Sequence, residues 1–174
     1  MTSEIRLATL DDAAAIASIH VQSWQSAYRG MMPQEHLDQL DVTQRTRAWT
    51  RALTSPDPAQ PAPLVAIADE QAVGFASIGP TRDQDADPAS TGEVRAIYLL
   101  PQAWGQGLGR GLMTAALAQL AGLGYQAATL WVLKENARAR RFYEAAGFTA
   151  DGAEQTEDIA GSPIAEVRYR RDLP

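Results

Sequence analysis

Residues 97–111 read IYLLPQAWGQGLGRG. A segment rich in β-forming residues ends at Pro101, and a turn with glycine at every second position, Gly105, Gly107 and Gly109, leads directly into helix-forming sequence. Glycine permits positive φ and lets backbone N–H groups approach a ligand, while the start of a helix carries partial positive charge. The stretch therefore predicts a strand, a turn and a helix that together bind a phosphate or pyrophosphate.

Two common phosphate-binding motifs do not fit this turn. A dinucleotide fingerprint needs glycine at relative positions one, three and six, and the sixth position counted from Gly105 or Gly107 is Arg110 or Leu112. A P-loop ends in Gly-Lys-Ser/Thr, and the chain contains no such tripeptide. A glycine turn needed only for tight packing of the strand against the helix remains an alternative.

Hydrophobic periodicity and the positions of proline and glycine predict the other elements. Helices come first, an antiparallel hairpin follows, and the order then becomes strand–helix–strand–helix–strand, which indicates a mixed α/β sheet. We expect helices at residues 9–30, 33–40 and 42–53, further helices after Gly109 and Asn136, and strands at 5–7, 64–68, 73–78, 93–100 and 127–133, with Phe148 and 164–169 supplying the last strands.

The composition narrows the classes of function. The chain has 174 residues, of which 45% are hydrophobic and 21% charged, and a net charge of −6, which argues against nucleic acid as a partner. It lacks cysteine, which excludes disulfides, thiolate metal sites and covalent cysteine intermediates, and two histidines are too few for a histidine-based metal site. Without a long apolar run or a signal segment, we expect a cytoplasmic protein that binds no membrane.

The glycine turn is similar to the coenzyme A pyrophosphate loop of the GNAT superfamily of N-acetyltransferases, whose pattern is Arg/Gln-x-x-Gly-x-Gly/Ala. Gly107 and Gly109 occupy its two glycine positions, and Trp104 stands where the family usually has Arg or Gln. The resemblance continues through LWVLKEN at residues 130–136 and RRFYEAAGF at residues 140–148. These segments match the family's next strand with its asparagine and its Phe-Tyr-x-x-x-Gly-Phe ending.

The resemblance implies an α/β (α+β) GNAT fold, with a mixed, mostly antiparallel central sheet flanked by helices, in a single domain over residues 1–174. It also implies an N-acetyltransferase that moves an acetyl group from acetyl-coenzyme A to the primary amine of a small molecule or peptide by direct attack. The residues that it places against the coenzyme are Ile97, Tyr98, Leu99, Gly105, Gln106, Gly107, Leu108, Gly109, Arg110 and Asn136, with Arg138 and Arg140 as further phosphate contacts or solvated surface residues.

Acetyl transfer needs a neutral amine, and a free alkyl ammonium has a pKa of about 10, so a base must remove its proton directly or through water. The resemblance gives this role to Glu93, at the start of the strand that precedes the glycine turn. Alternation with period two places Glu93, Arg95, Ile97 and Leu99 on one face of that strand. The alternative is a Glu93 that pairs with Arg95 or points into solvent.

The resemblance assigns Tyr143 the role of the acid that protonates the departing thiolate, and Asn136 a hydrogen bond to the pantetheine arm. The alternative for Tyr143 is an aromatic ring packed against Phe142 and Phe148. The alternative for Asn136 is a helix cap, a role that it can fill at the same time.

The acceptor side is the part that the sequence defines least. HVQSWQSAYRG at residues 20–30 resembles a first-helix pattern of one bacterial branch of the superfamily, which implies that Trp24 and Tyr28 wall the acceptor pocket. An aromatic wall suits a cation or an apolar amine, whereas the alternative is an aromatic stripe packed in the core. The aspartates at 83, 85 and 87 either attract a cationic acceptor or form a solvated loop. The resemblance also allows a homodimer.

Two other functions compete with the enzyme. The first is a binding module of the same fold that holds acyl-coenzyme A as a sensor without turnover, which the departure at Trp104 favours and the presence of Asn136 and Tyr143 opposes. The second is an enzyme of this kind that uses a different acyl donor.

We predict that acetyl-coenzyme A stabilises the folded protein, because the turn from Gly105 to Arg110 should bind its pyrophosphate. A ligand at a hundred times its dissociation constant adds about 2.7 kcal/mol, which corresponds to a rise of several degrees in melting temperature. Thermal melts with acetyl-coenzyme A, NAD and ATP measure this. A rise with NAD or ATP and none with acetyl-coenzyme A would contradict the assignment.

Overall fold

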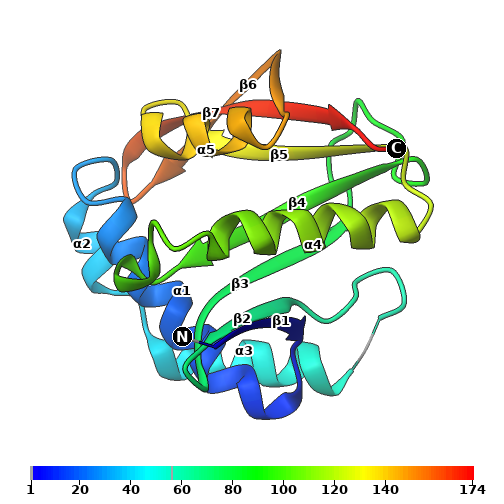
Figure 1. The fold of residues 1–174 in the computed structure, drawn as a ribbon. Coiled ribbons are helices and arrows are strands. Elements are labelled where there is room, and N and C mark those ends of the chain that lie inside the picture. Colours follow the sequence, from blue (N-terminus) through cyan, green and yellow to red (C-terminus); the bar gives the residue numbers. More distant parts are fainter. Residues whose placement is uncertain (1, 56) are drawn as a thin grey trace.

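The computed structural model describes residues 2–55 and 57–174. Figure 1 shows the elements in order along the chain. They are β1 (Ser3–Leu7), η1 (Leu10–Asp12), α1 (Ala13–Ala27), α2 (Gln34–Asp38), α3 (Val42–Thr54), β2 (Leu64–Ala68), β3 (Gln71–Pro80), β4 (Thr91–Leu99), η2 (Pro101–Ala103), α4 (Leu108–Gly122), β5 (Ala127–Leu133), α5 (Ala137–Ala145), β6 (Thr149–Ile159) and β7 (Ser162–Asp172).

The strands of this part of the chain form a seven-stranded sheet in the order β1-β2-β3-β4-β5-β7-β6. Neighbouring strands run antiparallel except β4 and β5, which run parallel. The mixed, mostly antiparallel sheet predicted from the sequence is therefore confirmed.

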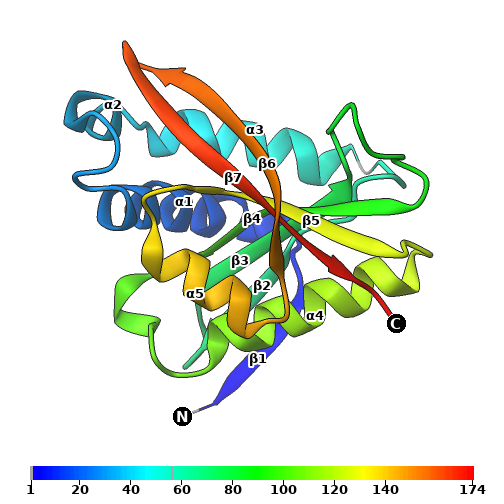
Figure 2. The ribbon, with the colours of Figure 1, turned by 90° about the horizontal axis from the view of Figure 1, so that it is seen from above.

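The sheet lies between two layers of helices (Figure 2). Side chains of α4, such as Leu112 and Leu120, pack against β3, β4, β5 and β7 on one face, where Phe142 of α5 adds to the same cluster. On the opposite face, Ile16 and Ile19 of α1 pack against the strands that carry Val65 and Phe75. No helix among the described residues is both long and apolar enough to cross a membrane.

The first helix begins as predicted from Thr9, with one difference. The Asp12 carboxylate accepts a hydrogen bond from the backbone N–H of Thr9 at 2.7 Å and forms an ion pair with Arg6 at 2.8 Å. These contacts hold a short 3₁₀ turn, η1, and the α-helix itself starts at Ala13. The side chain of Asp12 thus caps the N-terminal end of the first helical segment, which the sequence predicts at Thr9.

The last hairpin is longer than the sequence predicted. A whole strand, β6, precedes β7, where we expected only Phe148 and residues 164–169. Nearly every side chain of β6 is exposed, so the strand lacks the alternation of apolar and polar residues by which strands are recognised. The hairpin is closed by Ala160 and Gly161, which both adopt positive φ, as a two-residue turn requires.

A β-bulge in β4 changes the predicted arrangement of its side chains. Ser77 of β3 pairs with Ala96, and the next residue of β3 pairs with Val94, so Arg95 is the extra residue. Val94 consequently packs on the α4 face together with Ile97 and Leu99. The expectation that unbroken alternation carries Glu93 onto the face of Ile97 and Leu99 is wrong, because the bulge shifts the phase of the strand by one residue.

The bulge also marks the place where the sheet divides. β4 and β5 pair only at Thr91, Gly92 and Glu93, and the pairing stops directly before the bulge. Beyond this point the two strands diverge, as Figure 1 shows. The edge of β4 that faces β5 therefore carries no strand from Val94 to Leu99.

Candidate active site

A cavity of about 1080 Å³ lies where β4 and β5 separate. Its walls come from α1, β4, the glycine turn, α4, α5 and the end of β7, so that helices on both faces of the sheet contribute. Of the residues predicted from the sequence, the cavity brings together Tyr28, Ile97, Tyr98, Leu99, Gly105, Gly107, Gly109, Arg110, Asn136 and Tyr143. It does not include Trp24, Glu93, Gln106 or Leu108 in its lining.

The cavity runs along the unpaired edge of β4. Ile97, Tyr98 and Leu99 bond to β3 on one side only and line the cavity on the other. An exposed strand edge presents a row of N–H and C=O groups that can pair with an extended chain. A ligand with amide groups along its length, such as a pantetheine arm, fits this edge.

The glycine turn adopts the conformation that its sequence predicted. Gly105 and Gly107 have φ of +75° and +81°, and a Cβ atom at either position would meet no heavy atom within 4 Å. These two glycines are therefore required by backbone conformation and not by tight packing. Gly109 differs, because a Cβ atom there would lie 3.3 Å from the ring of Phe142.

The turn and the start of α4 present a row of unpaired backbone amides. Every backbone amide from Gly105 to Arg110 is without a hydrogen-bond partner in the described part of the chain, and the first amide of this region to find one is that of Gly111. Free amides at a helix start carry partial positive charge, which attracts phosphate. The free amides fit the pyrophosphate site that the sequence predicts, and that site stays a prediction.

Trp104, the departure from the family pattern, has two contacts in this turn. Its indole N–H donates to the carbonyl of Leu99 at 2.9 Å, which ties the turn to the end of β4. The guanidinium carbon of Arg138 lies 3.4 Å from the centre of its indole ring. The stacking places an α5 arginine in the cavity wall beside the turn, so a cation is present even though position 104 carries none.

Asn136 caps α5 and also faces the cavity. Its side-chain oxygen accepts from the N–H of Ala139 at 3.1 Å, which confirms the capping role. The residue is nearly buried and lines the cavity, and its amide nitrogen makes no hydrogen bond with the described residues. That nitrogen is available as a donor to a ligand.

Tyr143 packs among aromatic rings and lines the cavity at the same time. Its ring centre is 5.5 Å from that of Phe142 and 6.3 Å from that of Phe148. Burial, with a smaller contribution from Tyr98, raises the pKa of the Tyr143 phenol far above its ordinary value. The phenol therefore keeps its proton at neutral pH, which a proton donor must do.

Glu93 is buried and already engaged. The residue is 2% exposed, and its Oε2 atom accepts from two nitrogens of the Arg82 guanidinium. Its Oε1 atom accepts from the backbone N–H of Arg82 at 3.2 Å. Glu93 pairs with Arg82 and not with Arg95, whose guanidinium donates to the carbonyl of Pro80. The carboxylate belongs to the base of the split and not to the cavity wall.

The far wall of the cavity is part of α1. Tyr28 and Ser23 line the cavity, and the indole of Trp24 packs edge-on against Tyr28 with ring centres 5.2 Å apart. Sequence analysis missed Ser23. The sequence feature that could have identified Ser23 is its position on the helix face of Ile16 and Ile19, where the pattern calls for an apolar side chain and the chain has a hydroxyl.

The profile of the acetyltransferase (GNAT) family matches residues 16–148, a range that contains β4, the glycine turn and α5. The chain belongs to the GNAT family of acetyltransferases. Acetyl-coenzyme A is the co-substrate of this family, so the predicted acyl donor is confirmed. The free β4 edge, the unpaired amides of the turn and the Asn136 amide are groups that fit such a coenzyme.

Similar proteins agree with this assignment. The uncharacterised N-acetyltransferase YuaI of Bacillus subtilis (strain 168) is 33% identical over 167 residues, which cover 94% of this chain and 89% of that protein. The N-acetyltransferase of Staphylococcus aureus Mu50 superposes with a TM-score of 0.79 over 100% of both chains at 19% identity. The yncA protein of Salmonella typhimurium, solved with its cofactor acetyl-CoA, gives 0.76 over 100% of this chain and 95% of that chain at 24% identity. Both structures confirm the GNAT fold.

We predict that Arg138→Gln weakens the binding of coenzyme A by several-fold to about tenfold, because an exposed guanidinium beside the pyrophosphate supplies a modest charge-assisted contact. Titration calorimetry with coenzyme A and with pantetheine, which lacks the pyrophosphate, measures this. The matched control is Arg141→Gln, which removes the same charge from an exposed position on α5 that does not line the cavity. An equal loss with pantetheine, or an equal loss in the control, would show that Arg138 does not contact the phosphates.

Proposed function

We propose that this GNAT enzyme acetylates a primary amine of a small molecule or peptide by direct attack on acetyl-coenzyme A. The observation that supports this most is a single cavity lined from both faces of the sheet. Met113 and Thr114 of α4 line it on one face, and Ser23 and Tyr28 of α1 line it on the other. A coenzyme held by the turn and α4 and an amine that enters beside α1 can therefore be bound together, as direct transfer requires.

In the proposed reaction, the neutral amine nitrogen attacks the carbonyl carbon of the thioester and forms a C–N bond. The C–S bond then breaks, the nitrogen loses a proton, and the sulfur leaves as a thiolate. We assign Tyr143 as the acid that protonates this thiolate, because the phenol lines the cavity and its raised pKa keeps it protonated. The chain has no cysteine, so the acetyl group has no protein thiol on which to reside between donor and acceptor.

Glu93 remains our proposed base, acting through water. Arg82 occupies both oxygens of its carboxylate, and the side chain does not line the cavity. A direct contact between Glu93 and the amine is therefore not part of the proposal. The departure at Trp104 is weaker support for the sensor function than the sequence alone suggests, because Arg138 stacked on Trp104 places a cation beside the turn.

We predict that Tyr143→Phe lowers the turnover number by roughly a hundredfold, the lower end for general acid catalysis, while the affinity for acetyl-coenzyme A stays nearly unchanged. By analogy with cysteine, the thiol of coenzyme A has a pKa near 8.5, so its thiolate leaves fairly well without a proton. For this reason we expect the loss of turnover to be at the lower end of the range. Thiol release with one accepted amine gives turnover, and titration calorimetry gives affinity.

The matched control is Tyr125→Phe, because Tyr125 is partly buried and does not line the cavity. It should keep wild-type turnover. A Tyr143→Phe enzyme as fast as wild type would assign Tyr143 to the core alone. Wild-type protein that binds acetyl-coenzyme A and acetylates no amine of a broad panel would restore the sensor function.

A further inference from the structure

Glu166 of β7 lies on the α1 face of the sheet, beside the aromatic residues of the far cavity wall. It is directly opposite Leu133 of β5 in the antiparallel register, so both side chains point to the same face. Leu133 packs in one cluster with Trp24 and Tyr28. The sheet thus brings a carboxylate to the aromatic wall that sequence analysis predicted for the acceptor.

This position is nearer to the open end of the split than that of Glu93. Glu93 is level with Thr129 of β5, whereas Glu166 is level with Leu133, which is about 13 Å further along the strand at about 3.3 Å per residue. The strands diverge in that direction. Glu166 is therefore level with the wide part of the split, beside the cavity that Tyr98 and Leu99 line, although in the described part of the chain its own side chain, like that of Glu93, is not part of the lining.

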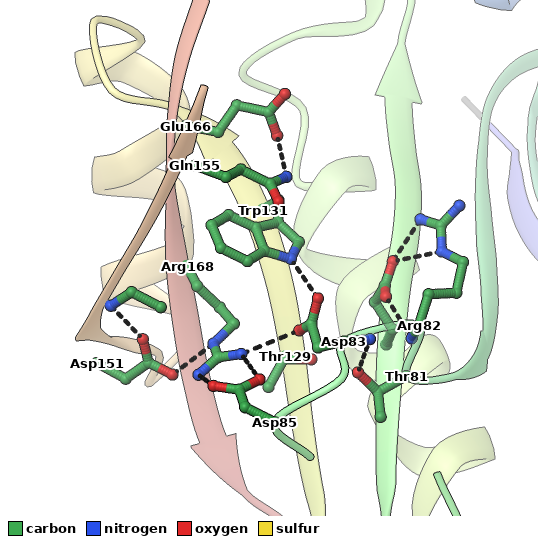
Figure 3. A network of polar contacts seen from close by, with 12 residues as sticks. Thr81, Arg82, Asp83, Asp85, Thr129, Trp131, Asp151, Gln155, Glu166 and Arg168 are labelled. Carbon is green, nitrogen blue, oxygen red and sulfur yellow. Dashed lines mark hydrogen bonds and ion pairs between the residues drawn. The ribbon is translucent and has the colours of Figure 1, made fainter. Parts of the chain in front are cut away.

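Glu166 has no cationic partner among the described residues. Its single hydrogen bond comes from the neutral amide of Gln155 at 3.4 Å. Two other carboxylates on this face, those of Glu93 and Asp83, bind Arg82 and Arg168 respectively. Figure 3 shows the contact between Asp83 and Arg168. The figure also shows the Glu166 carboxylate next to Gln155, on the side of the sheet that carries the indole of Trp131.

The electrostatic surroundings agree with this geometry. Burial, together with Glu157, raises the pKa of the Glu166 carboxyl in spite of the Gln155 hydrogen bond. Burial is also the main cause of the raised pKa of the Tyr28 and Tyr98 phenols, and the charge of Glu166 adds to both shifts. A bound cation would offset the cost of burying this carboxylate.

Polar groups of the α1 wall are without partners at the same place. The Ser23 hydroxyl is 2% exposed and lines the cavity, yet it makes no hydrogen bond in the described part of the chain. The indole N–H of Trp24 is likewise buried without a partner. Buried polar groups that the protein leaves unsatisfied cost stability, and a ligand that bonds to them removes this cost.

We propose that this corner is the acceptor subsite, and that it takes a primary ammonium ion attached to an aromatic group. Glu166 receives the ammonium, and the rings of Trp24, Tyr28 and Tyr98 contact the aromatic part. Ser23 supplies a further hydrogen bond. The assignment rests on the proposed function, because it identifies which amine the enzyme accepts and which carboxylate meets it.

Benzylammonium and its neutral counterpart benzyl alcohol test the subsite without turnover. Titration calorimetry is carried out on protein saturated with coenzyme A, which has no acetyl group to transfer. We expect wild type to bind benzylammonium at least tenfold more tightly than benzyl alcohol, because a charge-assisted bond to a carboxylate is lost with the alcohol. In Glu166→Gln this preference should fall by about tenfold or more, with the melting temperature and coenzyme affinity unchanged.

The matched control is Glu154→Gln on the same hairpin. Glu154 is opposite Val167, on the other face of the sheet, and its ion pair with Lys134 is half-exposed and weak. This variant should bind both compounds as wild type does. Wild type that does not bind benzylammonium, or a Glu166→Gln variant that keeps the full preference for the ammonium, overturns the subsite.

The two proposals fail separately in a second assay of thiol release with acetyl-coenzyme A. In one outcome the wild type acetylates amines of the panel, and Glu166→Gln has the same KM as wild type for each of them. This outcome supports the proposed function and contradicts the subsite. In the other outcome the wild type binds benzylammonium through Glu166 but releases no thiol with any amine. This outcome supports the subsite and contradicts the proposed function.

Discussion

The parallel pairing of β4 with β5 extends over only three residue pairs, and the site depends on its early end. The extra residue Arg95 bends β4 away from its neighbour directly after Glu93. A complete sheet would have covered the β4 edge and separated the helices of its two faces. The divergence instead leaves backbone groups free and lets one cavity reach from α4 to α1. The groups that we propose to bind the two substrates depend on this single irregularity.

The glycine turn carries local positive charge, whereas the net charge of the whole protein is negative. The chain has a net charge of −6 but must bind an anionic coenzyme. The groups that we propose for this binding are local: the unpaired amides from Gly105 to Arg110 and the guanidinium of Arg138 held on the Trp104 ring. On the other face, negative charge is neutralised by Arg82 and Arg168. Glu166 has no ion pair among the described residues, and we propose that its partner comes from outside the chain.

Local sequence signals predicted what depends on local conformation. The positive φ of Gly107, the Asn136 cap and the order of strands and helices were readable because each is determined by neighbouring residues. The bulge at Arg95 was not, since no glycine or proline marks it and it follows from pairing with β3. β6 was missed because a solvent-exposed strand has no apolar alternation. Glu166 was missed because a register between strands that are distant in sequence brings it to α1.

The most direct measurement is amide hydrogen exchange with and without coenzyme A. If the coenzyme pairs with the free edge of β4 and the turn, exchange should slow in peptides covering residues 97–99 and 105–110. Peptides covering residues 127–129, which already pair with β4 at Thr91 to Glu93, should not change. Coenzyme binding that leaves exchange at residues 97–99 and 105–110 unaltered would contradict a coenzyme site in the split of the sheet.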